Sequence, residues 1–573
     1  MKPQNLLFFI ILLILSAGCK KRDENIITEP PEGCISLSDL ETSQDYYLPF
    51  AIINEDTGIH SAFLNNKKVN LSNGRYIEFT ENGFYELVVI YSDTGRENDT
   101  ILFTTTTEER ENSEWGIRAW TPCPFLPVLI GREDVEMYYP PRYDDSISVP
   151  FIFYVKGTGI ITEIYCEGKC TSSGETFNIK QGVGSVEIPA TAIAGSVDFR
   201  VGGREFSASL SRVTRTDMEL RGTIDSHIEI PPNSVARITG NLEIGPAGSL
   251  TVHEGTMILV NEGIDINVGG PVVFEGTAEN PVFITCSRKN RFWGGFITRA
   301  AAGTIEAQYT IFCRSGYHDS EGYNWGHSGR QALFYTENSS LTLNHCFILD
   351  HAGQIFYPQN SVLILDNILV QRAQTGGQMN YSDLTLTNSV FTDFPDDSLV
   401  FRDTDNDALY LNATDADIEN TIFMFAKDDG LDSGLDEGGD ITITNCKFEA
   451  CFHEGAALSS RGTVEKNHTF TGCTFSNCGQ GLELGFSSPN HAVIASNCLF
   501  LYNGTGIRYG DNYEWSDVNG KILIKNSFSL YNDRDVWNMV RMNWAPKLGN
   551  MVFENTRVSE VCPQYPGLLL YGE

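Results

Sequence analysis

A four-residue motif, Asn-x-x-Phe, recurs at nearly regular intervals through the second half of the chain. It stands at residues 344–347, 388–391, 420–423, 445–448 and 497–500. Gly472 and Phe475 take the one missing place, and Asn367 divides the long first interval into two. Supersecondary units that recur every 20 to 50 residues or so are typical of solenoids. This half of the chain is therefore expected to form stacked coils.

The two fixed residues of the motif suit a chain that turns sharply and then packs. Asn tolerates left-handed backbone angles and its side chain bonds to nearby main chain, so a column of Asn residues fits a tight corner and can form a ladder. The Phe three positions later would point inward and stack on the Phe of the next coil. Alternating triplets such as Ile441-Thr442-Ile443 precede several motifs. Each repeat is therefore expected to supply one coil of short strands.

Further short segments carry a resemblance to a known fold. They are Leu242-Glu-Ile-Gly245, Ser249-Leu-Thr-Val252, His253-Glu-Gly255, residues 275–282 and Trp293-Gly-Gly295. Together with the motif they resemble the right-handed parallel β-helix of the pectin-lyase-like superfamily. The resemblance implies an all-β solenoid of about thirteen coils over residues 216–573, including a C-terminal cap. It implies no single activity, because the superfamily holds lyases, glycoside hydrolases, esterases, epimerases, adhesins and inert spikes.

The length requires more than one structural unit. At 573 residues the chain exceeds what a single compact core supports. In the N-terminal part of the chain, runs of alternating polar and apolar residues, such as residues 83–91, are separated by turn signals, which predicts small β-sandwiches. We expect one Ig-like module over residues 34–107 and a second over 131–215, with a connector at 108–130.

The N-terminus carries an export signal. Residues 1–18 contain an apolar run too short to span a bilayer, followed by small residues before Cys19. The order Leu15-Ser-Ala-Gly-Cys19 resembles the lipobox of bacterial lipoproteins, which implies removal of residues 1–18, lipidation of Cys19 and a tether over residues 19–33. Lys20 after the cysteine favours the outer membrane by the same resemblance. The expected location is therefore an outer-membrane lipid anchor, with the chain in the periplasm or on the surface.

The net charge of −34 narrows the choice of partner. A chain this acidic repels phosphate backbones, so we expect no nucleic-acid partner. Acidic polysaccharides would also be repelled at long range unless a cation bridges the two. Neutral or cation-bridged polysaccharide is the expected partner, and the oligomeric state stays open.

Counted from each motif Asn, ionisable pairs recur at the eighth and ninth positions of three successive coils. The pairs are Asp396 with Asp397, Asp428 with Asp429, and His453 with Glu454. If coils superpose, these side chains stack about 5 Å apart and repel one another, which requires either a hard cation or a retained proton. Calcium suits ligands that are all oxygen, here Asp396, Asp397, Asp405, Asp407 and Asp432. A retained proton would instead supply a general acid.

Two enzyme classes of this superfamily match parts of the pattern. Asp405-Asn-Asp407, Asp428-Asp429 and His453-Glu-Gly455 look similar to the acids of polygalacturonase-type hydrolases, which implies catalytic roles for Asp428, Asp429, His453 and Glu454. In calcium-dependent polysaccharide lyases a Lys or Arg removes the α proton, and Lys427 or Arg461 would serve. The substrate-binding candidates are Tyr323, Trp325, Arg461, Arg508 and Trp515. The alternative is a non-catalytic binding, display or adhesion rod with structural calcium only.

Overall fold

The computed structural model describes most of the chain between residues 35 and 558. The described residues are 35–40, 44–48, 50–54, 58–65, 67–71, 76–79, 83–92, 98–107, 135–155, 166–172, 175–182, 185–190, 193, 196–201, 204–299, 301–316, 331–394, 406–434, 439–460, 466–486, 491–509, 520–530, 532, 534–538 and 551–558. The chain divides into two compact units, one before and one after about residue 104. Each is described by itself.

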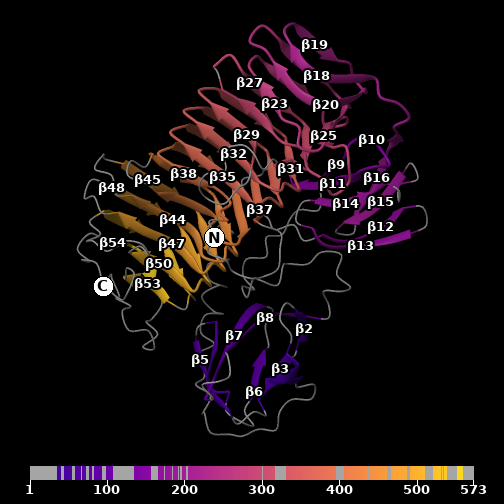
Figure 1. Cartoon of the computed structure of the whole chain (residues 1–573). Coiled ribbons are helices and arrows are strands. Elements are labelled where there is room, and N and C mark those ends of the chain that lie inside the picture. The colour runs from indigo at the N-terminus through magenta and orange to yellow at the C-terminus, as the bar shows by residue number, and fades with distance from the viewer. Residues whose placement is uncertain are drawn as a thin grey trace, which may run out of the picture. The chain divides into compact units, whose positions relative to one another are not determined.

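The first unit is a β-sandwich, as expected. One sheet has the strand order β1-β3-β6 and the other β2-β8-β7-β4-β5 (Figure 1). Apolar side chains between the sheets, such as Ile52, Leu87 and Phe103, are fully buried. Strand β7 has the bounds of the predicted alternating run. The strand bounds are β1 Ile35–Ser36, β2 Gln44–Leu48, β3 Phe50–Ile53, β4 Ile59–Leu64, β5 Lys67–Val69, β6 Tyr76–Phe79, β7 Gly83–Tyr91 and β8 Asp99–Thr107.

The second unit begins with another small β-sandwich. Sheets β14-β11-β9 and β13-β12-β15-β16 enclose Val149, Phe151 and Phe199, while β10 pairs with β17. The strand bounds are β9 Val135–Tyr138, β10 Arg142–Tyr143, β11 Ser148–Val155, β12 Cys166–Ser172, β13 Glu175–Gly182, β14 Ser185–Pro189, β15 Ser196–Val201, β16 Arg204–Ser209 and β17 Ser211–Arg212.

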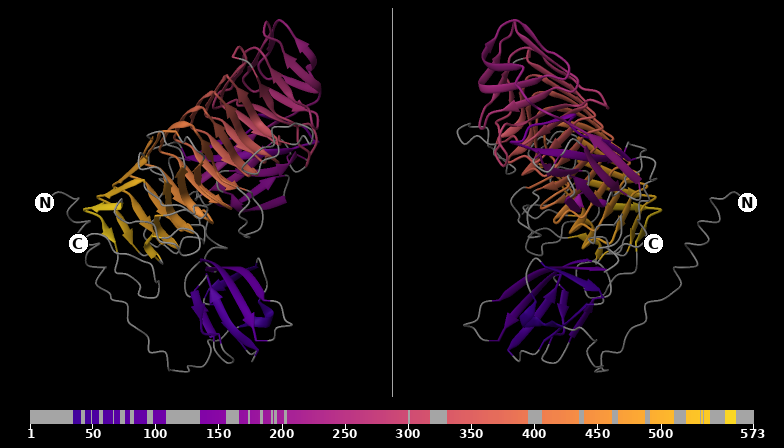
Figure 2. Two further views of the ribbon diagram at one scale, coloured as in Figure 1. Left: turned by 60° about the vertical axis from the view of Figure 1, so that its left-hand side comes forward. Right: turned by 90° about the vertical axis from the view of Figure 1, so that its right-hand side faces the viewer.

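A parallel β-helix follows, from β18 (Met218–Ile224) to β55 (Arg557–Val558). Its strands form three rows, because every coil contributes one strand to each row and pairs in parallel with the coils on either side (Figures 1 and 2). In each coil the first strand belongs to row 1, the second to row 2 and the third to row 3. Within the described residues row 1 has thirteen strands, close to the predicted number of coils. The coils around the candidate site are β36 Asp383–Thr387, β37 Val390–Phe394 and β38 Tyr410–Asn412; β39 Asp415–Glu419, β40 Ile422–Ala426 and β41 Leu431–Gly434; β42 Ile441–Thr444, β43 Lys447–Glu449 and β44 Glu454–Ser460; β45 Lys466–Thr471, β46 Thr474–Ser476 and β47 Gln480–Phe486; and β48 His491–Ser496, β49 Leu499–Leu501 and β50 Thr505–Tyr509.

The Phe residues of the motif stack inside the β-helix as predicted. The ring centroids of Phe423 and Phe448 lie 5.3 Å apart, and those of Phe448 and Phe475 lie 4.7 Å apart. Asn388, Asn420 and other motif Asn residues take the left-handed corner between rows 1 and 2, with φ near 50°. Asn420 donates its side-chain N–H to the Asn388 amide oxygen at 3.3 Å, so part of the predicted ladder is present.

The first motif, at 344–347, is one residue out of register. His345, with φ of 51°, takes the left-handed corner instead of Asn344. The pairing series Ile348, Val370 and Phe391 then shows that Phe347 faces outward. Phe347 packs there against Tyr138 of the second sandwich, with ring centroids 4.8 Å apart. The motif at this coil is a coincidence of sequence.

The outer face of row 2 is apolar where the second sandwich covers it. Phe283, Ile311 and Phe347 of the β-helix form one buried cluster with Tyr138 and Ile152 of the sandwich. Ion pairs supplement the contact: Arg314 with Glu187 joins the two parts, and Arg372, which binds Asp350, also donates to Ser185 Oγ at 2.8 Å. The sandwich and the β-helix therefore share an apolar core and form one unit.

Several expectations fall on residues that the structure does not describe. The signal peptide, Cys19 and the tether lie outside the described residues, as does the connector at 108–130. Among the described residues, no helix has the length and apolar character needed to cross a membrane.

Candidate functional site

The candidate site lies at the corner between rows 2 and 3. In two successive coils this corner ends in two ionisable residues and a glycine: Asp428-Asp429-Gly430 before β41, and His453-Glu454-Gly455 before β44. The glycine is required by close stacking, since a Cβ on Gly455 would lie 2.7 Å from the carbonyl oxygen of Gly481 in the next coil. The ionisable pairs of neighbouring coils are thereby held directly above one another.

Asp428, Asp429, His453 and Glu454 converge into one group, here called the acid–histidine cluster. One ligand atom from each lies within 4.8 Å of all the others. His453 Nδ1 lies 3.1 Å from Asp428 Oδ1, 3.7 Å from Asp429 Oδ1 and 2.5 Å from Glu454 Oε2. The imidazole therefore contacts three carboxyl groups from two coils.

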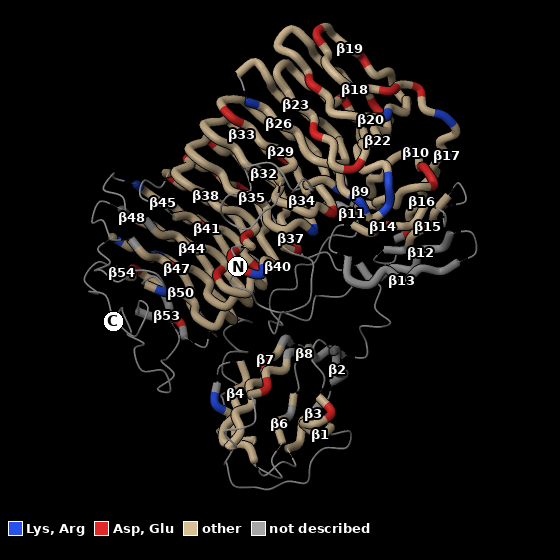
Figure 3. The backbone as a smooth tube through the Cα atoms, viewed as in Figure 1, with Lys and Arg blue, Asp and Glu red and all other residues tan. Residues whose placement is uncertain are grey.

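The cluster is buried except at the imidazole. Asp428, Asp429 and Glu454 are 4%, 7% and 1% exposed, whereas the His453 side chain keeps 24% of its surface. An incoming molecule would therefore meet His453 first, with the carboxyl groups behind it. Figure 3 shows acidic residues along the turns of the β-helix beside β40 and β41.

Burial and crowding favour the protonated forms of the cluster. Burial raises the pKa of Asp429 well above its usual range, and the charges of Glu454 and Asp428 add to this. Burial and the Glu483 charge raise the pKa of Glu454 in the same way. Burial alone would lower the pKa of His453, but the Asp428 hydrogen bond and the charges of Asp429 and Asp428 outweigh it and raise that pKa to about 9. At neutral pH the imidazole is charged, and the raised pKa values of Asp429 and Glu454 favour retention of protons on these two carboxyl groups.

The cluster continues as a buried polar ladder through neighbouring coils. Asp407 Oδ1 accepts the backbone N–H of Asp429 at 3.2 Å, and Asp429 Oδ1 accepts that of Glu454 at 2.8 Å. In the coil after Glu454, Gln480 donates to Glu454 Oε1 and, at 3.0 Å, to Glu483 Oε2. Glu483 also pairs with Arg508 at 2.8 Å. These contacts fix the acid positions from both sides along the β-helix axis.

In the preceding coil, the residues that stack on Asp428 and Asp429 differ from the predicted ones. Counting from the motif Asn placed Asp396 and Asp397 there, 32 residues earlier. Tyr410 pairs with Asp432, however, so this register is 22 residues and brings Asn406 and Asp407 beneath Asp428 and Asp429. The extra residues of this coil fall between β37 and β38, ahead of the aligned positions. The predicted stack is therefore wrong at this coil.

The register also shifts by one residue on the other side of the cluster. Counting placed Gln480 above His453, but Glu454 pairs with Gln480. The corner is three residues long between β46 and β47 and four between β43 and β44. The shorter corner therefore contains no residue in the position of His453.

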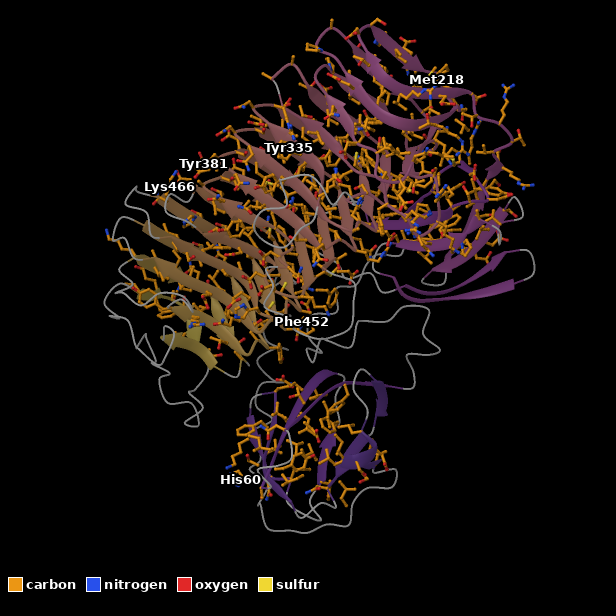
Figure 4. The ribbon with its side chains drawn as sticks, in the orientation of Figure 1. His60, Met218, Tyr335, Tyr381, Phe452 and Lys466 are labelled. Carbon is orange, nitrogen blue, oxygen red and sulfur yellow. The ribbon has the colours of Figure 1, made fainter. Side chains whose placement is uncertain are left out.

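The remaining predicted site residues have different surroundings. Asp407 adjoins the cluster, whereas Asp432 lies on β41 and is not among the four convergent groups. Arg508 is 2% exposed and held by Glu483, and Lys427 is 5% exposed with its Nζ 4.9 Å from the centre of the Phe452 ring (Figure 4). The others lie outside the described residues: Asp396, Asp397, Asp405, Tyr323, Trp325, Arg461, Trp515 and Cys19.

The donor set bears on which cation could bind. Asp428, Asp429 and Glu454 offer carboxylate oxygens, but His453 Nδ1 stands among them. Calcium prefers sites made of oxygen alone, whereas imidazole suits metals such as zinc. The predicted calcium ligands within the described residues, Asp407 and Asp432, supply oxygen only.

The comparison with family models agrees with this architecture. Residues 331–514 match a family model described as a right handed beta helix region. Among solved structures, the A-module of the mannuronan C-5 epimerase AlgE6 from Azotobacter vinelandii is similar, with 11% identity and a TM-score of 0.17 over 59% of this chain and 91% of that module. No curated protein matches the chain. The repetitive part of the chain is therefore a parallel β-helix of the right-handed kind that the family model describes.

Proposed function

We propose that this protein is a lipid-anchored surface protein that binds a polysaccharide and cleaves its glycosidic bonds at the acid–histidine cluster. The observation that carries the proposal is the position of His453, which is partly exposed and contacts three carboxyl groups from two coils. A charged acid at the surface with proton-holding groups behind it is the arrangement that general acid catalysis requires.

In hydrolysis the residues of the cluster would have separate roles. The His453 imidazolium donates its proton to the glycosidic oxygen as the bond to the sugar carbon breaks. Asp428, 3.1 Å from the imidazole, orients that ring and stabilises its charge. Water supplies the hydroxyl group to the sugar carbon, and its proton passes to the neutral imidazole of His453, which restores the imidazolium. No net proton is gained or lost.

The geometry supports hydrolysis better than β-elimination. A lyase needs an exposed base to remove the α proton, and the candidate base within the described residues, Lys427, is buried against Phe452. The raised pKa values of Asp429 and His453 favour donation of a proton over its removal.

Calcium is a separate part of the proposal. It would bind the oxygen-only side of this region through Asp407 and Asp432, with Asp396, Asp397 and Asp405 as further ligands. Its role there would be to hold the coils together, since the proton-holding cluster is balanced by His453.

A non-catalytic binding or display rod is the alternative. Its support is the burial of Asp429 and Glu454, which are 7% and 1% exposed and bond to the backbone or side chains of adjacent coils. In this case the cluster would only join coils.

The two functions are separated by activity on a glycan panel. Wild-type protein, His453→Gln and Asp428→Asn are incubated with neutral and uronic-acid polysaccharides, and new reducing ends and unsaturated products are measured. Cleavage supports the proposal if each variant lowers it at least about 100-fold, the usual range for general acid–base catalysis. The matched control is His253→Gln, because His253 is 25% exposed and pairs with Glu275 at 2.9 Å outside the cluster. Equal activity of His453→Gln and wild type would refute the mechanism.

The lipid anchor has its own test. Replacement of Cys19 by Ser should prevent lipid attachment, so the protein should move from the membrane fraction to the soluble fraction. Unchanged fractionation, with no lipid incorporated into wild-type protein, would contradict the anchor.

A further inference from the structure

Three amide side chains face outward from row 3, next to the coils of the acid–histidine cluster. Gln378 and Asn380 lie on β35 (Thr375–Asn380), and Asn412 lies on β38, where it pairs with Asn380. Their neighbour Met379 is fully buried in the β-helix core. Because side chains alternate along a strand, Gln378 and Asn380 point to the opposite, outer face. These three residues are here called the amide group.

The amide group is internally ordered. Asn380 Oδ1 accepts an N–H from Gln378 Nε2 and another from Asn412 Nδ2, both at 2.8 Å. The Asn380 amide nitrogen in turn donates to the carbonyl oxygens of Pro358 and Gln378. The amide nitrogens of Gln378 and Asn412 thus point toward Asn380. Their amide oxygens, Gln378 Oε1 and Asn412 Oδ1, are therefore the two acceptors that Asn380 does not bind.

Two acceptor atoms of the amide group accept no hydrogen bond from the described residues. Gln378 Oε1 and Asn412 Oδ1 are buried and have no hydrogen-bond partner among the described residues. Gln378 and Asn412 are 9% and 5% exposed. A buried acceptor without a partner costs about 1 to 3 kcal/mol, so such a pair on an outer face indicates a bound molecule that donates hydrogen bonds.

Aromatic rings lie beside the acceptors. In the ladder of row 3, Gln378 stands between Tyr357 and Tyr410, and Tyr357 stacks on Tyr335 with ring centroids 5.8 Å apart (Figure 4 labels Tyr335). Above Asn412 the ladder continues with Gly434, and the hydroxyl group of Tyr410 occupies the place that a side chain would take there. Tyrosine rings with fixed hydrogen-bonding groups are suited to sugars, which have an apolar face and a rim of hydroxyl groups.

We propose that the amide group, with Tyr357 and Tyr410, is a binding subsite for the hydroxyl groups of a neutral sugar unit. The two free groups are amide oxygens, which accept from hydroxyls and repel the carboxylate of a uronic acid. Asp432, which pairs with Tyr410 in the next coil, and the net charge of −34 act against an acidic sugar in the same direction. This inference rests on the proposed function and narrows its substrate to a neutral glycan.

The subsite lies where a single glycan chain could contact both the amide group and the acid–histidine cluster. Tyr410 pairs with Asp432 on β41, and the corner before β41 holds Asp428 and Asp429. Adjacent parallel strands lie about 4.8 Å apart, which is close to the length of one sugar unit. A glycan that runs along row 3 would therefore place neighbouring units at the amide group and at His453.

Calorimetry with neutral and uronic-acid hexasaccharides tests the subsite. The expected result for wild type is binding of at least one neutral hexasaccharide and much weaker binding of the uronic ones. Gln378→Met keeps the side-chain volume but removes the acceptor, and Asn412→Ala removes the other; each should weaken binding at least about tenfold. Asn467→Ala is the control, since Asn467 is exposed on β45 in row 1. Melting temperature and circular dichroism show whether each variant folds. If Asn412→Ala does not fold, the binding measured with Gln378→Met decides whether the subsite exists.

The outcomes separate the subsite from the proposed cleavage. If Asp428→Asn binds the neutral glycan but does not cleave it, both are supported. If wild type binds without cleaving and the amide variants bind less, the subsite stands and the cleavage proposal falls. If wild type binds no neutral glycan, or Gln378→Met binds as well as wild type, the acceptors hold an ordered water only and the subsite is overturned.

Discussion

His453 Nδ1 lies 3.1 Å from Asp428 Oδ1, although 25 residues separate them in the chain. The separation is one coil of the β-helix, so the contact exists only when consecutive coils are stacked. Formation of the cluster and folding of these coils are therefore the same event, and protonation of the cluster must affect stability.

Stability is expected to fall as pH rises through the titration of His453. The pKa of His453 is about 9 in the folded protein and about 6.5 in an unfolded chain. A group whose pKa is raised by folding stabilises fully below its unfolded pKa, and this contribution is lost as pH rises through the folded one. Wild type should exceed His453→Gln in unfolding free energy by a few kcal/mol at pH 6, and the difference should close by about pH 10.

Urea denaturation across this pH range provides the measurement. The raised pKa values of Asp429 and Glu454 act in the same direction, so wild type should lose stability from acid pH upward. His253→Gln serves as the control for loss of an imidazole outside the cluster. A difference between wild type and His453→Gln that does not depend on pH would show that His453 does not titrate as described.

Removal of one ring from the Phe stack should destabilise the β-helix strongly. Phe448 is fully buried between Phe423 and Phe475, so Phe448→Ala leaves a cavity and should cost about 3 to 5 kcal/mol. Phe528→Ala is the comparison, because Phe528 is 38% exposed and should cost less than about 1 kcal/mol. Equal losses in melting temperature would contradict the role of the stack.

A methyl group at Gly455 should separate the coils that carry the cluster. The Cβ of Ala would lie 2.7 Å from Gly481 O and 3.1 Å from Phe448 Cβ, so backbone must move. Gly455→Ala should lower the unfolding free energy by about 1 to 3 kcal/mol. Gly240→Ala is the matched control, since the nearest atom to its Cβ would be 3.7 Å away. A neutral Gly455→Ala would mean that the coils tolerate wider spacing.

Calcium should raise the melting temperature of wild type if the proposed oxygen ligands hold it. Binding to the folded state alone stabilises by about 2.7 kcal/mol at a calcium concentration one hundred times Kd. Asp407→Asn should reduce the shift, and chelation should reverse it. Absence of any shift in differential scanning calorimetry would remove calcium from the proposal and leave the proton-holding cluster as the means of balancing charge.

The β-helix was predictable because its determinants are local and repeated. Asn at a left-handed corner and Phe three positions later are required in each coil for the same reason, and together they define where a coil begins. The prediction was wrong at Asn344 because His345 takes the corner, and the sequence pattern alone does not exclude this choice.

The candidate site was less predictable than the fold. Counting from the corner brought together Asp428 and His453 because no residue is inserted between the corner and either side chain. It misplaced Asp396 and Gln480, where one coil has extra residues and another has a shorter corner. Gln378, Asn380 and Asn412 gave no signal in sequence, because isolated amides in alternating strands resemble an ordinary polar surface.

The shared core between the second sandwich and row 2 limits how the chain can be divided. A protein expressed from residue 216 would keep every coil but expose Phe283, Ile311 and Phe347 to water as one continuous apolar surface. Such a surface promotes self-association, so the shorter protein would be expected to aggregate. A shortened form of this protein that keeps the β-helix should therefore begin no later than β9.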